Sequence, residues 1–456
     1  MSMFKWDVIE PAPGEPVAPN QRLPWGKTVG VGAQHVVAMF GATFVFPLVM
    51  GLDPNLAIMF SGICTILFLL ITSNKVPSYL GTSASFVAGV SAIRLQHDGD
   101  SADVTGAIMV AGLVLLLVGI IVHFGGSGII HKILPPAVTG AVVMLIGFNL
   151  APVVAGIYWP QDQWVALLTA TFMICAAVLL PGFWARIAVF LALIFGYVIS
   201  WLFDGIFGQI NSVLGGAAEA TDHDRVSWTG VKAADWIGLP SGKLADGVDV
   251  VHGPHFGATF ILLVLPGVIA LIAENTGHVK AVAEMTGNDL DPYMGRAIGA
   301  DGFATALASA FGGSPTTTYA ENIGVMGATR VYSTAAYYVA GAVAILLGLC
   351  PKFGAIVSAT PGGVLGGITI VLYGMIGLVG AKIWVENHVD FGDPVNMVGL
   401  AGGLIAGIGG VTLKISDNFE LSGIALGTIM VIVYFHLVNR TRGGHETGAT
   451  EVTRAL

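Results

Sequence analysis

The sequence predicts an all-α polytopic membrane protein whose 14 transmembrane segments form two inverted seven-segment repeats. Three observations lead to this fold class. Hydrophobic residues make up 55% of the 456 residues and charged residues only 10%, whereas charged residues are about 25% of a typical soluble domain. Apolar runs recur in two groups of seven on either side of a polar stretch at residues 204–254. The third run of each group is interrupted, and matched interruptions are typical of inverted-repeat transporters.

The order of elements follows from the apolar runs. Residues 1–27 are polar and lack the apolar core of a cleavable signal, so we expect a cytoplasmic tail. The first repeat covers residues 28–205, a linker covers 206–254, the second repeat covers 255–440, and 441–456 form a cytoplasmic C-terminal tail. Several runs are shorter than the ~20 residues needed to cross a bilayer and must be tilted, broken or buried. The runs are 28–50, 56–72, 76–95, 108–124, 137–159, 165–180, 187–203, 256–272, 297–311, 316–329, 337–349, 356–378, 395–408 and 424–437.

The interrupted segments lie near residues 77–90 and 310–330. The second contains a Gly-Gly-Ser-Pro break and three successive threonines before Glu321. Thr316 to Tyr319 favour an extended backbone, and the residues from Glu321 onward favour a short helix. We therefore predict that the third and tenth segments contain short antiparallel strands that pair at mid-membrane, near Gly81 and Tyr319. The alternative for the first segment is that its glycine and serine residues only permit close helix packing.

The distribution of basic residues predicts the orientation, because Lys and Arg are enriched on the cytoplasmic side of membrane proteins. With the N-terminus inside, 13 of the 19 Lys and Arg residues fall in the tails and cytoplasmic loops. We expect a multi-pass protein of the cell membrane (inner or plasma membrane) with both termini in the cytoplasm and an acidic linker outside. The net charge of −9 is spread over loops and gives no reason to expect a nucleic-acid partner.

Few ionisable residues lie within the apolar runs, where each is costly unless it faces a cavity or a partner. Glu274 and His278 are four positions apart and share one helix face, Glu321 lies at the second break, and Asp301 lies in the ninth run. His35 stands alone in the first run and suits a structural hydrogen bond to a neighbouring helix. The Glu274-x-x-x-His278 spacing could also present two metal ligands, but there is no HExxH motif or third ligand cluster. We predict no metal and no cofactor.

Three motifs carry a family resemblance. The pattern Glu321-Asn322-x-Gly324-x-x-x-x-Thr329-Arg330 resembles the signature of the nucleobase-ascorbate transporter family, also called nucleobase-cation symporter 2. Residues 271–278, Leu-Ile-Ala-Glu-Asn-Thr-Gly-His, are similar to the glutamate and histidine segment of that family, and Gln34-His35 matches its first helix. The resemblance covers roughly residues 22–440 and is to bacterial uracil and pyrimidine permeases.

The resemblance implies a transporter rather than an enzyme, and a substrate site. Glu274 and Glu321 would hold the edge of the base, main-chain amides near Ala84 and Ala320 would meet its carbonyl groups, and His278 would help to couple proton movement. Tyr319 belongs to the same implied site. Uracil permeases of this kind carry phenylalanine at the position of Ala84, so stacking on the ring would pass to Phe86, the nearest aromatic residue. The family also implies a homodimer, a core domain (about 28–124 plus 255–351) and a gate domain (about 133–205 plus 355–440).

The functional hypothesis is symport of a neutral nucleobase with H⁺, most simply uracil or a related pyrimidine. An ionised carboxylate is costly at membrane depth, so protonation of Glu274 could act as the switch, with Glu321 as a second proton-coupling group held mainly for substrate geometry. Alternatives remain open: a xanthine or urate symporter of the same family, or an anion exchanger with the same architecture. A purely structural scaffold would not need buried carboxylates.

Overall fold

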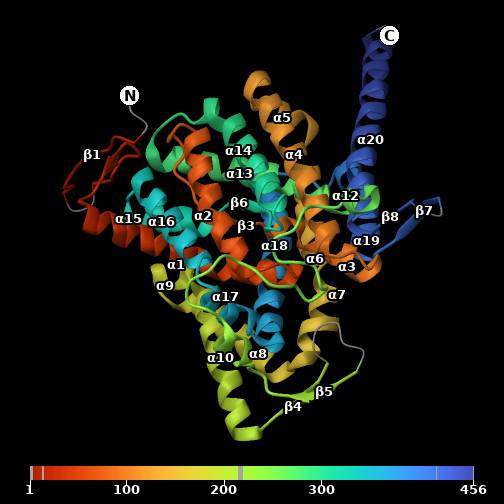
Figure 1. Cartoon of the computed structure of the whole chain (residues 1–456). Coiled ribbons are helices and arrows are strands. Elements are labelled where there is room, and N and C mark those ends of the chain that lie inside the picture. Colours follow the sequence, from red (N-terminus) through yellow and green to blue (C-terminus); the bar gives the residue numbers. More distant parts are fainter. Residues whose placement is uncertain (1–3, 13–14, 214–218, 417–418, 455–456) are drawn as a thin grey trace.

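The computed structural model describes residues 4–12, 15–213, 219–416 and 419–454, and it is mostly helical (Figure 1). Within these ranges, eight helical spans are long and apolar enough to cross a membrane. The prediction of a helical polytopic membrane protein is therefore confirmed. The spans are α1 (Trp25–Met50), α2 (Pro54–Ile71), α4 (Ser101–Gly125), Pro136–Gln161, α10 (Ala188–Phe207), Ala258–Thr286, α18 (Gly362–Glu386) and Gly423–Thr441 of α20 (Gly423–Arg454).

Shorter helices complete the chain. The span at 136–161 consists of α6 (Pro136–Phe148), α7 (Ala151–Val153), η2 (Val154–Tyr158) and η3 (Trp159–Gln161), and the span at 258–286 consists of α12 (Ala258–Val264) and α13 (Pro266–Thr286). Further helices are α5 (Gly128–Ile133), α8 (Gln163–Leu179), α9 (Phe183–Arg186), η4 (Asp291–Tyr293), α14 (Met294–Ser309), α16 (Thr334–Gly348), α17 (Pro351–Ser358) and α19 (Pro394–Ile408).

Several predicted boundaries differ from the structure. The run expected at 356–378 is not one helix, because α17 ends at Ser358 and α18 begins after Pro361. Pro361 has no N–H to continue the preceding helix. The chain bends by 80° between α16 and α17, so α17 does not simply prolong the span before it. At the other end, α20 continues through Arg454 into the region expected as a tail.

Two short strands lie in the buried interior. β3 (Leu80–Thr82) pairs antiparallel with β6 (Thr316–Thr318), with Gly81 opposite Thr317. The main-chain N–H of Ser83 donates to Pro315 O at 2.9 Å and that of Tyr319 donates to Tyr79 O at 3.0 Å, which extends the pairing at both ends. All six strand residues are buried. The strands therefore satisfy main-chain polar groups that an interrupted helix would otherwise leave unpaired at membrane depth.

Glycine residues set the distance between α4 and α14. A Cβ atom added to Gly302 would come within 2.3 Å of the main-chain N of Leu116, and one added to Gly119 within 2.2 Å of the main-chain N of Gly299. The two helix backbones are thus in direct contact, as small residues allow in membrane proteins. Because α14 contributes Asp301 and packs against β6, this contact also supports the interior described below.

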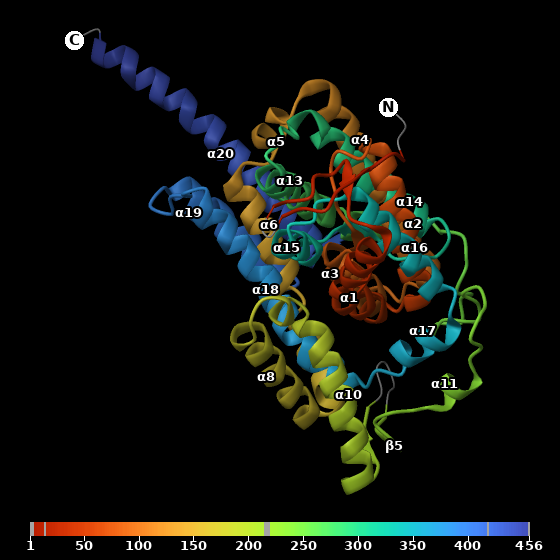
Figure 2. The ribbon, with the colours of Figure 1, turned by 90° about the vertical axis from the view of Figure 1, so that its left-hand side faces the viewer.

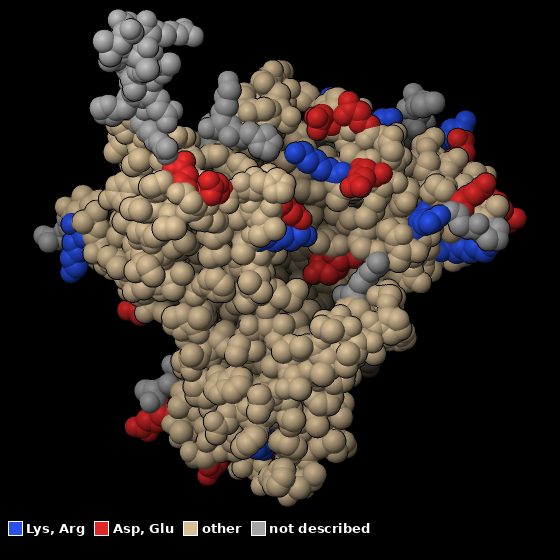
Figure 3. Space-filling view, turned by 180° about the vertical axis from the view of Figure 1, so that it is seen from behind, with Lys and Arg blue, Asp and Glu red and all other residues tan. Residues whose placement is uncertain are grey.

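The helices form two groups (Figures 1 and 2). One group contains α1, α2, α4, α14 and α16, and in Figure 2 the other group, with α8, α10, α18 and α19, lies to the left of it and below. α18 packs on α6 and α8, and α16 packs on α1 and α2. The end of α20 projects away from both groups. A space-filling view shows few charged side chains on the lower part of one face and a charged rim around a hollow near its centre (Figure 3).

The linker between α10 and α12 contains β4 (Ile210–Ser212), β5 (Thr221–His223) and α11 (Thr229–Ala233). Ion pairs hold it at two places. Arg225 forms ion pairs with Asp162 at 2.7 Å and with Asp204 at 3.1 Å, at the ends of α8 and α10. Asp246 pairs with Arg94 of α3 (Val87–Gln96) at 3.1 Å. The linker is therefore attached to both groups of helices.

We expect Asp246→Asn to lower the free energy of unfolding by about 1.5 kcal/mol, because Asp246 also accepts hydrogen bonds from the N–H and hydroxyl groups of Ser101. Partial burial opposes ionisation, but the bonds from Ser101 and Arg94 outweigh it and lower the pKa of Asp246. The stabilisation is therefore present above the unfolded pKa of about 3.9 and is lost as the pH falls through the folded value. Thermal unfolding of the detergent-solubilised protein across this pH range measures it.

Asp249→Asn is the matched control, since Asp249 lies in the same linker and its ion pair with Lys243 is exposed. That substitution should change the unfolding temperature little. Equal effects of the two substitutions would contradict a specific role for Asp246.

Candidate functional site

The two interrupted segments bring the starts of two short helices to one cavity. η1 (Ala84–Phe86) follows β3, and α15 (Ala320–Thr329) follows β6. Ala84 and Ala320 both line a cavity of about 790 Å³. The first N–H groups of a helix lack partners within it and lie at the positive end of its dipole. Each helix start can therefore donate hydrogen bonds to a ligand in this cavity.

Glu274 and His278 line the same cavity from α13. They lie one turn apart on one helix face, as their spacing predicted. The structure thus brings together four of the predicted site residues: Ala84, Glu274, His278 and Ala320. The cavity is therefore lined both by the acceptor oxygens of a carboxyl group and by donor N–H groups of the main chain. This combination suits a small planar ligand that has both donors and acceptors on its edge.

The opposite wall of the cavity comes from α6 and α18 and is aliphatic. Val143 and Ile146 of α6 and Ile376 and Val379 of α18 line it. Charged residues lie toward one end: Lys280 and Glu284 of α13, and Lys382 and Glu386 of α18, the last two 3.5 Å apart. The cavity lining therefore has an aliphatic part, from α6 and α18, and a charged end.

A chain of hydrogen bonds leads from His278 into the interior. His278 Nδ1 lies 2.7 Å from the hydroxyl oxygen of Thr318, which donates to Asn275 Oδ1 at 3.4 Å. The amide of Asn275 donates to a carboxyl oxygen of Asp301, which is fully buried in α14. Asp301 is thus a second buried carboxyl group connected to the cavity through His278.

Three other predicted residues occupy different surroundings. Phe86 is fully buried, and its ring packs on Gly267 at the start of α13. Tyr319 is 4% exposed and its hydroxyl donates to Thr82 O at 2.7 Å, with its ring against Gly81. Glu321 lies in the first turn of α15, next to Ala320. None of the three is among the residues that line the 790 Å³ cavity.

The family-motif residues mainly join elements. The side-chain amide of Asn322 donates to His35 O at 2.9 Å, and the His35 ring lies 4.3 Å from that of Tyr337, so α1, α15 and α16 meet here. Gln34, beside His35, is exposed, and Gly324 is in the middle of α15. α15 ends at Thr329, whose hydroxyl donates to Val325 O at 2.9 Å. Arg330 follows in the left-handed conformation (φ 57°), and its carbonyl accepts from Val17 N.

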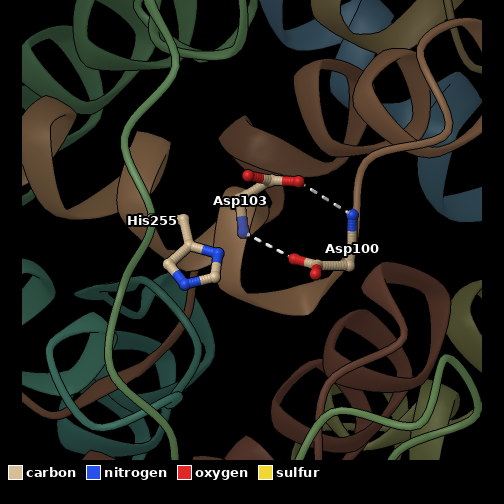
Figure 4. Close-up of side chains that lie close together, drawn as sticks. All are labelled: Asp100, Asp103 and His255. Carbon is tan, nitrogen blue, oxygen red and sulfur yellow. Dashed lines mark hydrogen bonds between the residues drawn. The ribbon is translucent and has the colours of Figure 1, made fainter.

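Two further features do not include Glu274. A larger cavity of about 910 Å³ is lined by linker residues and by Arg94 and Asp162. Asp100, Asp103 and His255 form the only group with metal-ligand chemistry among the described residues (Figure 4). Asp100 and Asp103 each accept a hydrogen bond from the main-chain N–H of the other, as a capping box at the start of α4. Capping explains this pair of carboxylates without a metal.

The chain is similar to proteins of a known family. Residues 26–415 match the Permease family. The protein named "Putative pyrimidine permease RutG" of Escherichia coli (strain K12) is 42% identical over 430 residues, which cover 93% of this chain and 92% of the relative. The uracil permease of Bacillus caldolyticus is 35% identical over 90% of this chain and 91% of the relative, and that of Escherichia coli (strain K12) is 34% identical over 91% of each.

The chain belongs to the nucleobase-ascorbate transporter family. The family predicted from the motifs at residues 34–35, 271–278 and 321–330 is confirmed. The protein is therefore a transporter rather than an enzyme.

Solved structures with a similar fold are more distant in sequence. The transmembrane domain of the cyanobacterial bicarbonate transporter BicA has a TM-score of 0.55 and 15% identity, covering 90% of this chain and 96% of that domain. The murine anion transporter Slc26a9 in the inward-facing state has a TM-score of 0.62 and 12% identity, covering 91% of this chain and 68% of the other. At this identity the likeness concerns the fold alone.

Sequence reasoning did not assign Asn275, Thr318 or Asp301 to the site. The sequence does show Asp301 as an ionisable residue in an apolar run, and it shows Asn275 next to Glu274. The hydrogen bonds between Thr318, Asn275 and Asp301 could not be predicted, because they depend on how α13, α14 and β6 pack together.

Proposed function

We propose that this protein imports a nucleobase, most simply uracil or a related pyrimidine, by symport with protons. The observation that carries the proposal is the position of Glu274, which shares one cavity with the helix starts at Ala84 and Ala320. The relatives that are uracil and pyrimidine permeases support the substrate class.

The chemistry of the base matches this arrangement. A uracil ring offers N–H donors beside C=O acceptors on one plane. The carboxyl group of Glu274 accepts from a ring N–H, and main-chain N–H groups near Ala84 and Ala320 donate to ring carbonyls. Glu321, in the first turn of α15, holds the base from the other side when the cavity closes around it. The aliphatic residues of α6 and α18 cover the face of the ring. Phe86 and Tyr319, which do not line the cavity, would support the two helix starts by packing against Gly267 and Gly81.

Coupling to protons follows from linkage. A protonated Glu274 can donate a hydrogen bond to a base carbonyl, which an ionised carboxylate cannot do, so proton and base favour each other's binding. His278 lies one turn away and relays the proton. Hydrogen bonds through Thr318 and Asn275 hold the imidazole ring in place and connect it to the carboxyl group of Asp301.

The transport cycle is alternating access between a core domain (about 28–124 plus 255–351) and a gate domain (about 133–205 plus 355–440). The cavity lies between residues of these two parts: α13, η1 and α15 on one side, and α6 and α18 on the other. In this proposal the 14 segments form two inverted seven-segment repeats, both termini are cytoplasmic, and two copies associate through gate helices in the cell membrane.

An anion exchanger is the second candidate, and the folds of BicA and Slc26a9 favour it. Against it stands Glu274, since an ionised carboxylate in the cavity repels an anion. A xanthine or urate symporter would use the same donors and acceptors.

Uptake into proteoliposomes tests the proposal. An inwardly directed proton flux, imposed by a more acidic exterior, should drive accumulation of labelled uracil above the external concentration. Collapse of the gradient with a protonophore should leave only equilibration. Labelled xanthine, urate, bicarbonate and sulfate are measured in parallel. Uracil accumulation that ignores the gradient would contradict the coupling, and transport of bicarbonate or sulfate without any base would favour the exchanger.

A further inference from the structure

The linker carries a short apolar segment that the transport site does not use. Trp236 is 72% exposed, Ile237 87% and Leu239 70%. Three large apolar side chains so close together in an exposed connection are unusual on a surface that faces water, and such patches mark contact with another phase or partner.

This segment is fixed to the rest of the protein. The main-chain N–H of Gly238 donates to Leu349 O at 3.0 Å, and that of Lys352 donates to Asp235 O at 2.8 Å. Leu349 and Lys352 flank the 80° bend between α16 and α17. The exposed residues are thus held beside the bend between α16 and α17.

The exposed residues continue an apolar surface. Leu346, in the last turn of α16, is 67% exposed, and Ile356 of α17 is 40% exposed. An exposed leucine on a membrane-spanning helix faces lipid. The bend turns α17 away from the direction of α16, so α17 does not continue the path of α16.

Charge placement also fits a membrane interface. The ammonium group of Lys352 lies over the Trp236 ring, 5.3 Å from its centroid. Tryptophan rings concentrate at the level of lipid headgroups, and lysine side chains extend their charge toward the phosphates while their stems stay in the apolar region. Both side chains are therefore suited to the same depth, the level of the lipid headgroups.

We propose that residues 235–239 and α17 form an interfacial anchor that rests in the headgroup region of the bilayer on the linker side. Ile237 and Leu239 enter the upper acyl region, Trp236 lies at the headgroups, and Lys352 contacts lipid phosphate. The occupant is lipid rather than a soluble partner, because the patch is continuous with the lipid-facing end of α16.

The anchor also reaches the second group of helices. The ring of Trp228, before α11, lies 5.9 Å from that of Tyr197 in α10, and the Tyr197 hydroxyl donates to Ile356 O at 2.7 Å. The membrane contact is therefore placed where the linker, α10 and α17 meet, and it ties the linker to the membrane surface at that junction.

Spin labelling in proteoliposomes tests the anchor. Cys175 and Cys350 are replaced by alanine, buried Cys64 is kept, and the chain without a new cysteine serves as the labelling blank. Nitroxides are attached at Ile237→Cys and, as the matched control, at Lys243→Cys, whose native side chain in the same linker is 69% exposed. Collision rates with oxygen, which partitions into lipid, and with a water-soluble nickel chelate are compared.

We expect the ratio of oxygen to nickel collisions to be several-fold higher at position 237 than at position 243. A nickel-dominated signal at both positions would overturn the proposal. So would a label at 237 that is shielded from both reagents and shows spin–spin broadening that disappears on dilution with unlabelled protein, because a second copy would then cover the patch. The measurement needs no transport, so its outcome is independent of the substrate proposed above.

Discussion

Replacing Glu274 by glutamine should abolish gradient-driven accumulation of uracil and weaken uracil binding by about 10- to 100-fold. The binding loss corresponds to about 1.5–3 kcal/mol for a hydrogen bond to a charged or ionisable group. Glutamine keeps the size and one acceptor oxygen of the side chain, but it cannot take up or release a proton. Binding is measured by the thermal shift that uracil produces in the purified protein, and accumulation by uptake into proteoliposomes.

Glu284→Gln provides the matched control. Glu284 lies on the same helix and lines the same cavity, but near its charged end rather than beside Ala84 and Ala320. Both substitutions replace one carboxyl group of the cavity lining by an amide, so a general electrostatic effect would appear in both. Concentrative uptake that survives in Glu274→Gln would rule out the proposed role of Glu274, while equal losses in the two variants would show that only the total charge matters.

The interrupted segments could be placed from the sequence because their residue types cannot form continuous membrane helices. Pro315 removes a donor, and three threonines favour extended backbone. The spacing of Glu274 and His278 similarly placed both on one face, because the period of a helix is fixed. These local rules act within about one turn, so they constrain residues within one segment but not the contacts between segments.

Other positions could not be predicted because they depend on packing between distant segments. An aromatic residue beside an interrupted segment can line a cavity or pack against the main chain. The local sequence is the same in both cases, so it does not distinguish between them. Tyr319 covers Gly81 of the paired strand, and Phe86 packs on Gly267 of α13. The attachment of Asn275 to Asp301 joins α13 to α14. None of these partners is fixed by periodicity along one helix.

The glycines of α14 offer the strongest test of how the helices hold this site. Gly302→Leu should leave little or no folded, monodisperse protein after solubilisation, with a loss of about 3 kcal/mol or more, because overpacking against a backbone cannot be relieved by a side-chain rotation. The new side chain would meet the main chain of α4 at Leu116. Position 302 is next to Asp301 in α14. Separation of the two helices would then also displace Asp301 from Asn275.

Gly205→Leu separates this clash from the general effect of removing a helix glycine. Gly205 lies in α10, and an added Cβ atom there meets nothing within 4 Å. Leucine is intrinsically favoured over glycine in a helix by somewhat less than about 1 kcal/mol, so this control should fold as well as the native chain or slightly better. Size-exclusion profiles and melting temperatures of both variants measure the difference. If Gly302→Leu behaves like Gly205→Leu, then α4 and α14 do not need backbone contact, and the position of Asp301 must be held by β6 and α13 instead.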